Sequence, residues 1–282
     1  MRRITSRQNP LVATFRAVAR GDRPGLLLDG PHLVAEALAS RVAITQAMVT
    51  PEGLERADVR ALVERLDRSG AAVVSVTAPV MAAVSSVRSP SPIIAVADRR
   101  EDNQERIYGA APEAPLVVIA CDVQDPGNLG AIVRVAEAAG ATGVMAAGES
   151  ADPFGPKALR GSMGSALRLP VAAGDAAEAV FAARRRGCRV LAAVPRGGRS
   201  LFDLDLTGPI AVLIGGEGAG LPPSLASQAD ECFTIPMASP VDSLNAAVAA
   251  ALVVYEARRQ RHSERRTSNV ERRTSNETER RT

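Results

Sequence analysis

The sequence predicts an α/β protein that is divided into two domains. Short, unbroken apolar runs such as Ile210–Ile214 alternate with helical stretches, a pattern typical of parallel strands that are covered on both faces. One charged stretch, residues 98–115, contains Gly and Pro and almost no apolar residues, which is typical of a linker. A chain of 282 residues is long enough for two α/β halves joined in this way. We therefore expect a small domain over residues 1–97 and a larger domain over residues 116–262.

The composition indicates a protein with a hydrophobic core that contains few aromatic residues. Hydrophobic residues make up 46% of the chain but aromatic residues only 2%, so the core must be built from Ala, Val and Leu. No apolar run reaches the length of a membrane span and no apolar signal region follows Met1, so we expect a cytoplasmic protein. Cys121, Cys188 and Cys232 are odd in number and widely spaced. We expect them to be buried small hydrophobes, and we expect no disulfide and no metal site.

The net charge of +3 is weak support for a nucleic-acid partner. The last twenty residues, from Ser263, hold six Arg and four Glu and so contribute +2 of that charge. This segment repeats the motif ERRTSN and has one apolar residue, Val270, so it cannot bury enough surface to offset its ordering entropy. We expect residues 263–282 to be disordered, with arginines that add sequence-independent affinity for RNA.

The N-terminal domain, residues 1–97, is predicted to fold as helices around a mostly parallel sheet. Prolines at positions 10 and 31 are typical of first helical residues. His32, at the start of a helix, is either a surface residue or an RNA contact. The expected helices are residues 10–19, 31–39 and 52–68, and the expected strands are residues 26–28, 44–49, 72–76 and 93–96.

The C-terminal domain, residues 116–262, shows the same alternation. A helix should begin near Asn128 and end at Gly140, another should follow Lys157, and Ser243 is a good N-cap for a long helix that ends around Arg261. The expected strands are residues 116–121, 142–146, 189–194, 210–214 and 232–235.

The loop after strand 210–214 is the candidate cofactor site. Its four glycines, Gly215, Gly216, Gly218 and Gly220, allow positive φ and close approach of a ligand to the main chain. In open α/β sheets, ligands bind beyond the carboxyl ends of strands. The G-x-G-x-x-G and Walker patterns both fail here, and the carboxylate of Glu217 would repel phosphate. A cation such as a sulfonium, or ribose hydroxyls, would suit the loop better, although a plain tight turn is the other interpretation.

Two further groups of residues have both a functional and a structural interpretation. Gly130 precedes Arg134 by one helical turn, which would leave the space above the guanidinium open, but Arg134 and Glu137 could also form an ordinary surface pair. Arg160, Ser162 and Ser165 lie on the next helix and either line a pocket or pack closely.

The order of these motifs resembles the SpoU (TrmH-like) family of the SPOUT superfamily. The matching runs are DVQDPGNLGAIVRVAEAAGATGV, DPFGPKALRGSMGSALRLPV, LIGGEGAGLP and IPMASPVDSLNAAVAAALVVYEARRQ, which together cover about residues 116–261. Members of that family are S-adenosylmethionine-dependent RNA 2′-O-ribose methyltransferases. The N-terminal domain, with LLLDGPHLVAEAL and MAAVSSVRSPSPIIAVA, is similar to the ribosomal-protein-like substrate-binding domain of members that modify rRNA.

The resemblance implies a trefoil-knotted catalytic domain that binds S-adenosylmethionine in the knot, together with a homodimer formed through that domain. By match to the family's motifs, the implied catalytic residues are Asn128, Arg134, Glu217, Ser243 and Asn245. The implied cofactor-binding residues are Ile214, Gly215, Gly216, Gly218, Gly220, Ile235, Met237 and Leu244. The stretch that holds Arg160, Ser162 and Ser165 is placed near the substrate. The chain departs from the family at Ala247, where a small polar residue is common.

The resemblance also implies a role for Arg134 as the base that accepts the proton of the ribose hydroxyl. Bringing an arginine pKa from about 12.5 to neutral pH costs roughly 7 kcal/mol. Holding the target phosphate and orienting the hydroxyl would cost less and would equally require Arg134.

We expect 23S rRNA to be the substrate, because of the N-terminal domain. A tRNA methyltransferase, an antibiotic-resistance methyltransferase and a non-catalytic RNA-binding protein of the same fold are the alternatives. A nucleotide-dependent oxidoreductase is disfavoured by the two failed phosphate patterns.

Overall fold

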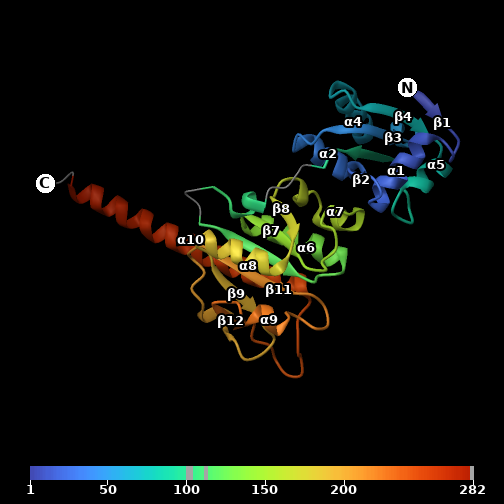
Figure 1. Ribbon diagram of the computed structural model, residues 1–282. Coiled ribbons are helices and arrows are strands. Elements are labelled where there is room, and N and C mark those ends of the chain that lie inside the picture. Colours follow the sequence, from blue (N-terminus) through green and yellow to red (C-terminus); the bar gives the residue numbers. More distant parts are fainter. Residues whose placement is uncertain (100–103, 111–113, 280–282) are drawn as a thin grey trace. The chain divides into compact units, whose positions relative to one another are not determined.

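The computed structural model describes residues 1–99, 104–110 and 114–279 (Figure 1). The chain forms two compact units, which are described separately. The first unit contains Met1–Asn103, Asp125–Arg134 and Ala151–Pro170, and the second contains Gln104–Gln124, Val135–Ser150 and Val171–Thr282. The α/β class expected from the sequence is confirmed in both units.

The first unit is built on a mixed five-stranded sheet of order β1-β4-β3-β5-β2. Its strands are β1 (Arg2–Ile4), β2 (Leu26–Asp29), β3 (Ile44–Val49), β4 (Ala72–Val76) and β5 (Ile93–Ala97). Its helices are α1 (Pro10–Arg20), α2 (Pro31–Ala39), α3 (Pro51–Glu55), α4 (Ala57–Arg68), α5 (Ala78–Val84) and α7 (Pro156–Ser162). The predicted helices and strands of this region are present. The predicted helix 52–68 is interrupted at Arg56, whose ψ of 129° is extended, and β1 and α5 were not predicted.

The prediction of a mostly parallel sheet is wrong for half of the strand pairs in the first unit. β1 and β3 are parallel to β4, but β5 is antiparallel to both β3 and β2. The reason is the short helix in the connection before β5. Helix α5 has seven residues and rises about 10 Å, too little to return the chain along a neighbouring strand. Ile93 therefore starts opposite Val49, at the carboxyl end of β3, and β5 runs back from there.

The core of the first unit forms where α1 and α5 cover the sheet. α1 begins at Pro10, after Asn9, whose side chain accepts a hydrogen bond from the Leu11 N–H. It buries one apolar face, with Val12, Phe15 and Val18. These residues pack with buried side chains of β2, β3, α5 and β5, namely Leu27, Met48, Met81 and Ile94.

The second unit is built on a seven-stranded parallel sheet of order β10-β12-β9-β11-β6-β7-β8. Its strands are β6 (Leu116–Cys121), β7 (Gly143–Ala147), β8 (Val171–Gly174), β9 (Arg189–Ala193), β10 (Arg199–Ser200), β11 (Ile210–Gly215) and β12 (Glu231–Thr234). Helices α8 (Ala176–Arg185), α9 (Pro223–Ala226) and α10 (Ala246–Glu279) accompany it, and α6 (Pro126–Ala139) follows β6. β8, α8, β10 and α9 were not predicted. The unbroken apolar runs of β6, β7 and β11 are almost wholly buried, as expected for central parallel strands.

Part of the predicted linker packs against the core of the second unit. Residues Gln104–Tyr108 form a short 3₁₀ helix, and both Ile107 and Tyr108 are buried in the apolar cluster of β6, β7 and α8. Gly143 allows this contact, because a Cβ there would lie 2.4 Å from the Cα of Ile107. Residues 100–103 and 111–113 of the predicted linker lie outside the described residues.

Helix α10 ends the described chain. It continues to Glu279, so the prediction that residues from 263 onward are disordered differs from the structure up to that position. The reason is local: Glu and Arg are good helix formers, and no Gly or Pro interrupts the segment. Residues 280–282 lie outside the described residues. Among the described helices, none is both long and apolar enough to cross a membrane.

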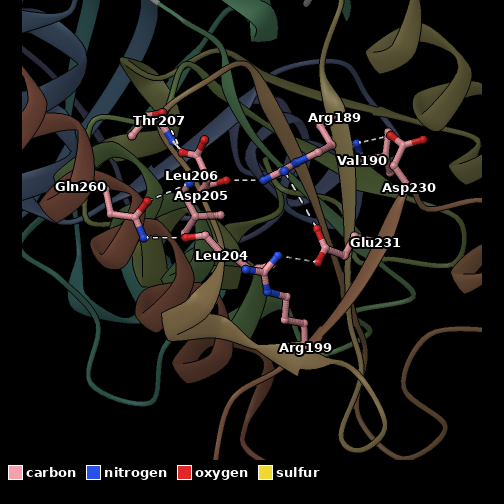
Figure 2. A network of polar contacts seen from close by, with 10 residues as sticks. All are labelled: Arg189, Val190, Arg199, Leu204, Asp205, Leu206, Thr207, Asp230, Glu231 and Gln260. Carbon is pink, nitrogen blue, oxygen red and sulfur yellow. Dashed lines mark hydrogen bonds and ion pairs between the residues drawn. The ribbon is translucent and has the colours of Figure 1, made fainter.

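A polar network fastens the segment between β10 and β11 to the sheet (Figure 2). Arg189 donates to the carbonyl oxygen of Asp205 and lies 4.0 Å from the carboxylate of Glu231, which also pairs with Arg199 at 3.5 Å. Gln260 of α10 accepts from the Leu206 N–H at 2.8 Å and donates to the carbonyl oxygen of Leu204 at 2.9 Å. The network therefore ties β9, β12, α10 and this connecting segment together.

Two of the three cysteines are buried, as predicted. Burial raises the pKa of Cys121 to about 12 and that of Cys188 to about 11. Both thiols therefore stay protonated near neutral pH and act as small apolar groups. Cys232 is partly exposed.

Candidate cofactor and active site

A cavity of about 370 Å³ lies in the second unit, beyond the carboxyl ends of β9, β11 and β12. All eight predicted cofactor-binding residues line it: Ile214, Gly215, Gly216, Gly218, Gly220, Ile235, Met237 and Leu244. Three of the five predicted catalytic residues line it as well: Glu217, Ser243 and Asn245. Residues from four stretches of the second unit, around positions 194, 217, 236 and 245, thus meet at one cavity.

The four glycines of the loop after β11 serve two different purposes. Gly218 and Gly220 have φ of 91° and 66°, a left-handed backbone that other residues rarely adopt. Gly215 and Gly216 instead allow close packing of main chain. A Cβ on Gly215 would lie 2.3 Å from the carbonyl carbon of Gly220, and one on Gly216 would lie 1.9 Å from the carbonyl oxygen of Asp122. The loop closes on itself through a bridge between Gly216 and Gly220, which leaves the main chain bare toward the cavity.

Replacing Gly216 by alanine is expected to weaken binding of the cofactor. The new Cβ cannot coexist with the Asp122 carbonyl, so the loop must move by more than an ångström. Overpacking of this kind costs about 2 kcal/mol, roughly a thirtyfold loss of affinity if it falls on the bound state. Isothermal titration with S-adenosylmethionine measures the effect.

The control for this substitution is Gly208→Ala, because a Cβ on Gly208 meets no atom within 4 Å and its backbone is not left-handed. It should leave the affinity unchanged. Equal affinities for Gly216→Ala and Gly208→Ala would show that the loop does not hold the cofactor.

Asn245, and not Ser243, is the N-cap of α10. Its Oδ1 accepts from the N–H groups of Ala247 at 2.9 Å and Val248 at 3.3 Å, and the helix begins at Ala246. The predicted capping role of Ser243 is therefore wrong. Ser243 lies in the irregular segment before the helix, where it is exposed and lines the cavity. At the departure from the family pattern, Ala247, the main-chain N–H is capped by Asn245.

The turn after β6 is held in an unusual conformation next to the glycine loop. Asp122 has a φ of 56°, which is uncommon for a residue with a side chain. Its Oδ1 accepts from the Glu149 N–H at 2.8 Å, and Ser150 Oγ accepts from the Val123 N–H at 3.0 Å. The turns after β6 and β7 thus fix each other, and this fixes the Asp122 carbonyl against which Gly216 packs.

The two remaining predicted catalytic residues lie in the part of α6 that belongs to the first unit, since the division between the units falls after Arg134. The Asn128 N–H donates to Asp125 Oδ1 at 2.9 Å, and Asp125 also pairs with Lys157. The hydrogen bond from Lys157 and the one from the Asn128 N–H hold the pKa of Asp125 below its ordinary value, so it caps the helix as a carboxylate. Arg134 is exposed, and within the described part of the chain its guanidinium makes no hydrogen bond or ion pair. Neither residue is among those that line the cavity.

Gly130 has a packing role that differs from the predicted one. A Cβ on Gly130 would lie 2.3 Å from the carbonyl oxygen of Ala158 and 2.9 Å from the N–H nitrogen of Ser162. The glycine therefore lets α7 lie against α6, which corrects the interpretation that it leaves space above Arg134. Ser162 and Ser165 are buried, and Ser162 Oγ donates to the Leu159 carbonyl oxygen. For these two serines the close-packing interpretation holds.

Sequence reasoning missed one wall of the cavity. Ala193, Val194 and Pro195 line it at the end of β9, and Ala246 and Ala249 line it on α10. A signal for the first three was present: β9 pairs with β11 in parallel, and the carboxyl ends of neighbouring parallel strands share one edge of the sheet. Within residues 1–99, 104–110 and 114–279, no group of three or more His, Cys, Asp or Glu side chains is placed to bind a metal ion.

Known proteins of this architecture share both parts of the chain. A relative from Synechocystis sp., described as an uncharacterized tRNA/rRNA methyltransferase, is 33% identical over 91% of this chain and 93% of its own length. The 23S rRNA (guanosine(2553)-2′-O)-methyltransferase RlmP of Bacillus subtilis is 29% identical over 92% of this chain and its whole length. The crystal structure of the SpoU methyltransferase AviRb from Streptomyces viridochromogenes, in complex with the cofactor AdoMet, is similar to this chain in fold.

That structure superposes with a TM-score of 0.81 at 28% identity and covers 91% of this chain and 99% of its own. The MRM3-like substrate binding domain matches residues 19–95, and the SpoU rRNA Methylase family matches residues 115–255, half of the chain. The resemblance seen in the sequence is confirmed by these matches. The chain belongs to the SpoU rRNA Methylase family.

Proposed function

We propose that this protein transfers a methyl group from S-adenosylmethionine to a ribose 2′-hydroxyl of 23S rRNA. The observation that carries the proposal is the cavity at the carboxyl ends of β9, β11 and β12, which combines bare main chain, apolar walls and one carboxylate. Family membership supports the reaction class. The relatives RlmP and AviRb support the substrate and the cofactor, because the first is a 23S rRNA 2′-O-methyltransferase and the second binds AdoMet.

The residues of the cavity fit S-adenosylmethionine. The volume of about 370 Å³ is within the range of small-molecule sites. A Cβ on Gly218 or Gly220 would meet no atom within 4 Å, so the main chain of the loop is open to a ligand at these two positions of the cavity lining. Ile235, Met237 and Leu244 offer an apolar surface for the adenine ring of the cofactor. Glu217 is exposed, lines the cavity and supplies a carboxylate that attracts a cation or accepts hydrogen bonds from ribose hydroxyls.

When bound, the cofactor would supply an electrophilic methyl group on a sulfonium. The chain's own residues would bind and orient the two reactants. We assign cofactor binding to Ile214, Gly215, Gly216, Gly218, Gly220, Ile235, Met237 and Leu244. We assign Asn128, Arg134, Glu217, Ser243 and Asn245 to positioning and catalysis, with Asn245 acting through the cap that sets where α10 begins.

Arg134 is proposed to hold the target phosphate and orient the ribose hydroxyl. Its exposed guanidinium has a planar fork of donors that matches a phosphate. Using it as a base would cost roughly 7 kcal/mol, whereas fixing the hydroxyl's direction costs little and lowers the barrier through orientation. Asn128, six residues before Arg134 on the same helix, would help to fix the ribose.

The substrate is assigned to 23S rRNA because of the N-terminal region. Residues 19–95 match a substrate binding domain, and RlmP, which has that substrate, aligns over its whole length. We propose a cytoplasmic location as well, because the proposed substrate is rRNA. We keep the bounds 1–97, 98–115 and 116–262 as proposed limits of the substrate-binding domain, the linker and the catalytic domain.

The test is transfer of labelled methyl from S-adenosylmethionine to unmodified total RNA, followed by separation of rRNA from tRNA and digestion to nucleosides. Label recovered as a 2′-O-methyl nucleoside in 23S rRNA is the expected result. Label in tRNA would overturn the substrate assignment and leave the reaction standing. An absence of both label and cofactor binding would favour a non-catalytic RNA-binding protein and overturn the proposal.

We also propose a homodimer formed through α10. Val248, Leu252 and Tyr255 are large, exposed apolar residues at spacings of four and three, so they share one face of the helix. The opposite side of the same helix, with Ala250, Val253 and Val254, is buried in its own unit. A second apolar face on a helix that is already packed fits a second copy of the chain.

The double substitution Leu252→Glu with Tyr255→Glu is expected to convert the dimer to a monomer. Two carboxylates on each copy would have to be buried against each other, which costs several kcal/mol. Light scattering after size-exclusion chromatography measures the mass. The control is Phe181→Glu, which adds a carboxylate at an exposed aromatic residue of α8. A dimer that survives the double substitution would rule out the α10 face.

A trefoil knot is proposed for the second unit. Its support is the sheet order: β11 and β12 follow each other in the chain but lie on either side of β9. The chain must therefore pass over β9 before it enters α10, close to the cavity. Stretching a single molecule from both ends tests this. A knot leaves the unfolded chain shorter than the contour length of about 3.6 Å per residue, and full extension would exclude it.

A further inference from the structure

A buried carboxylate lies in the first unit, outside the proposed cofactor site. Asp29, at the end of β2, is 6% exposed. Its Oδ2 accepts three hydrogen bonds, from the Ser85 hydroxyl at 2.9 Å, the Ser86 N–H at 2.9 Å and the Ser86 hydroxyl at 3.0 Å. Its Oδ1 is also buried and accepts none from the described residues. A buried charge with one open acceptor is costly unless a cation lies nearby.

Arg160 of α7 is linked to this carboxylate through Ser86. The Arg160 Nη1 donates to Ser86 Oγ, the same hydroxyl that donates to Asp29. Ser86 therefore connects a guanidinium to a buried carboxylate, and the polarised hydroxyl strengthens both hydrogen bonds. All three residues belong to the first unit. Two further contacts hold the same region: Arg168 pairs with Glu36, and His32 Nε2 lies 3.2 Å from the Met163 carbonyl oxygen.

Arg160 keeps most of its hydrogen-bonding capacity. A guanidinium has five N–H groups, and within the described residues one atom of this side chain, Nη1, has a partner. The helix that carries it lies against α6, since Gly130 and Gly161 both lack the Cβ that would separate the two helices. α6 carries Asn128 and Arg134. A half-buried guanidinium on a helix that supports these residues is well suited to an RNA phosphate.

We propose that Arg160 binds a phosphate of the RNA substrate, and that Asp29 positions it through Ser86. The proposal rests on the proposed function, because it takes RNA as the substrate. In this proposal Asp29 is a positioning residue. Its carboxylate lies in the segment that matches the substrate binding domain, and it acts on the Arg160 guanidinium in the segment that matches the methylase family. The competing role for Asp29 is local and structural, as the acceptor that holds residues 85 and 86 in place.

The experiment measures affinity for in vitro transcribed 23S rRNA over a range of salt concentrations, for the full chain and its variants. Loss of one phosphate contact lowers the slope of log K against log [salt] by about 0.7 to 0.9. Arg160→Gln and Asp29→Asn should each lower the slope by that amount and weaken binding about tenfold. The double variant should be no weaker than Arg160→Gln alone. Asp29→Asn keeps an acceptor for the serines while removing the charge.

Ser86→Ala is the second variant, because it keeps the buried carboxylate and removes only the connecting hydroxyl; it should lower the slope in the same way. The matched control is Asp22→Asn, an exposed carboxylate of the same unit that pairs with Arg20, which should leave the slope unchanged. Additive effects of Asp29→Asn and Arg160→Gln, or weaker binding with an unchanged slope, would overturn the positioning role. A wild-type chain without salt-dependent RNA binding would instead overturn the proposed function, and this inference with it.

Discussion

Replacing Arg134 by alanine is expected to lower the rate of RNA methylation about a thousandfold while S-adenosylmethionine binds as before. The rate should fall because orientation and proton transfer at a reacting hydroxyl each contribute factors of this size. Stability should not change, because the side chain is exposed and makes no hydrogen bond or ion pair with any described residue. Single-turnover kinetics with saturating RNA, together with cofactor titration, measures both quantities.

Two further experiments separate the hydrogen-bonding geometry of Arg134 from its charge. Arg134→Lys keeps the charge but loses the planar fork, so it should recover only a small part of the rate. Added guanidinium ion should partly restore Arg134→Ala, since the missing group would return in solution. Arg185→Ala is the control, because Arg185 is likewise exposed on a helix, α8. Near-normal turnover of Arg134→Ala with normal cofactor affinity would eliminate both the orienting role and the base.

Sequence patterns were sufficient for the elements whose apolar runs are long and buried. β6, β9 and β11 have five or six residues each, and their borders agree closely with the predicted ones. Shorter or less apolar elements were missed. β1 and β10 have three and two residues and lie at sheet edges, so burial leaves little pattern in their sequence. The direction of β5 depends on the length of α5 and on where the chain leaves that helix. A local sequence pattern does not show either consequence for strand direction.

The candidate site was predictable where chemistry depends on composition and unpredictable where it depends on contacts. Four glycines beside a buried strand indicate a ligand loop, and they line the cavity. The sequence does not show that Gly216 packs against the Asp122 carbonyl oxygen, or that Gly130 packs against the main chain of α7, because each partner is distant in the chain. Ser243 and Asn245 both suit an N-cap, and only the backbone shows that Asn245 has that role. The same holds for Asp29 and Arg160, which are joined through Ser86.

Replacing Arg261 by methionine is expected to destabilise the second unit by about 3 kcal/mol and to lower its melting temperature by roughly 6 to 12 °C. The guanidinium donates to four main-chain carbonyl oxygens: those of Leu206 at 3.1 Å, Ala114 at 2.8 Å, Pro115 at 3.0 Å and Gly208 at 2.7 Å. These carbonyls come from two segments that enter β6 and β11, so one side chain of α10 holds the starts of two central strands. Methionine keeps the apolar stem and removes all four donors.

The size of the effect follows from what the carbonyls can do without Arg261. They are partly exposed, so water can replace some of the lost donors, and the total stays well below four separate charged hydrogen bonds. Arg259→Met, two residues earlier, is the control: its guanidinium pairs with Glu256 at the surface, where water screens the pair, so its loss should barely change the melting temperature. Gln260 still holds Leu204 and Leu206 through two hydrogen bonds (Figure 2), so part of the segment should stay attached in Arg261→Met. Hydrogen exchange of Arg261→Met should then show faster opening at the starts of β6 and β11. Equal melting temperatures for Arg261→Met and Arg259→Met would show that α10 is held by its apolar face alone.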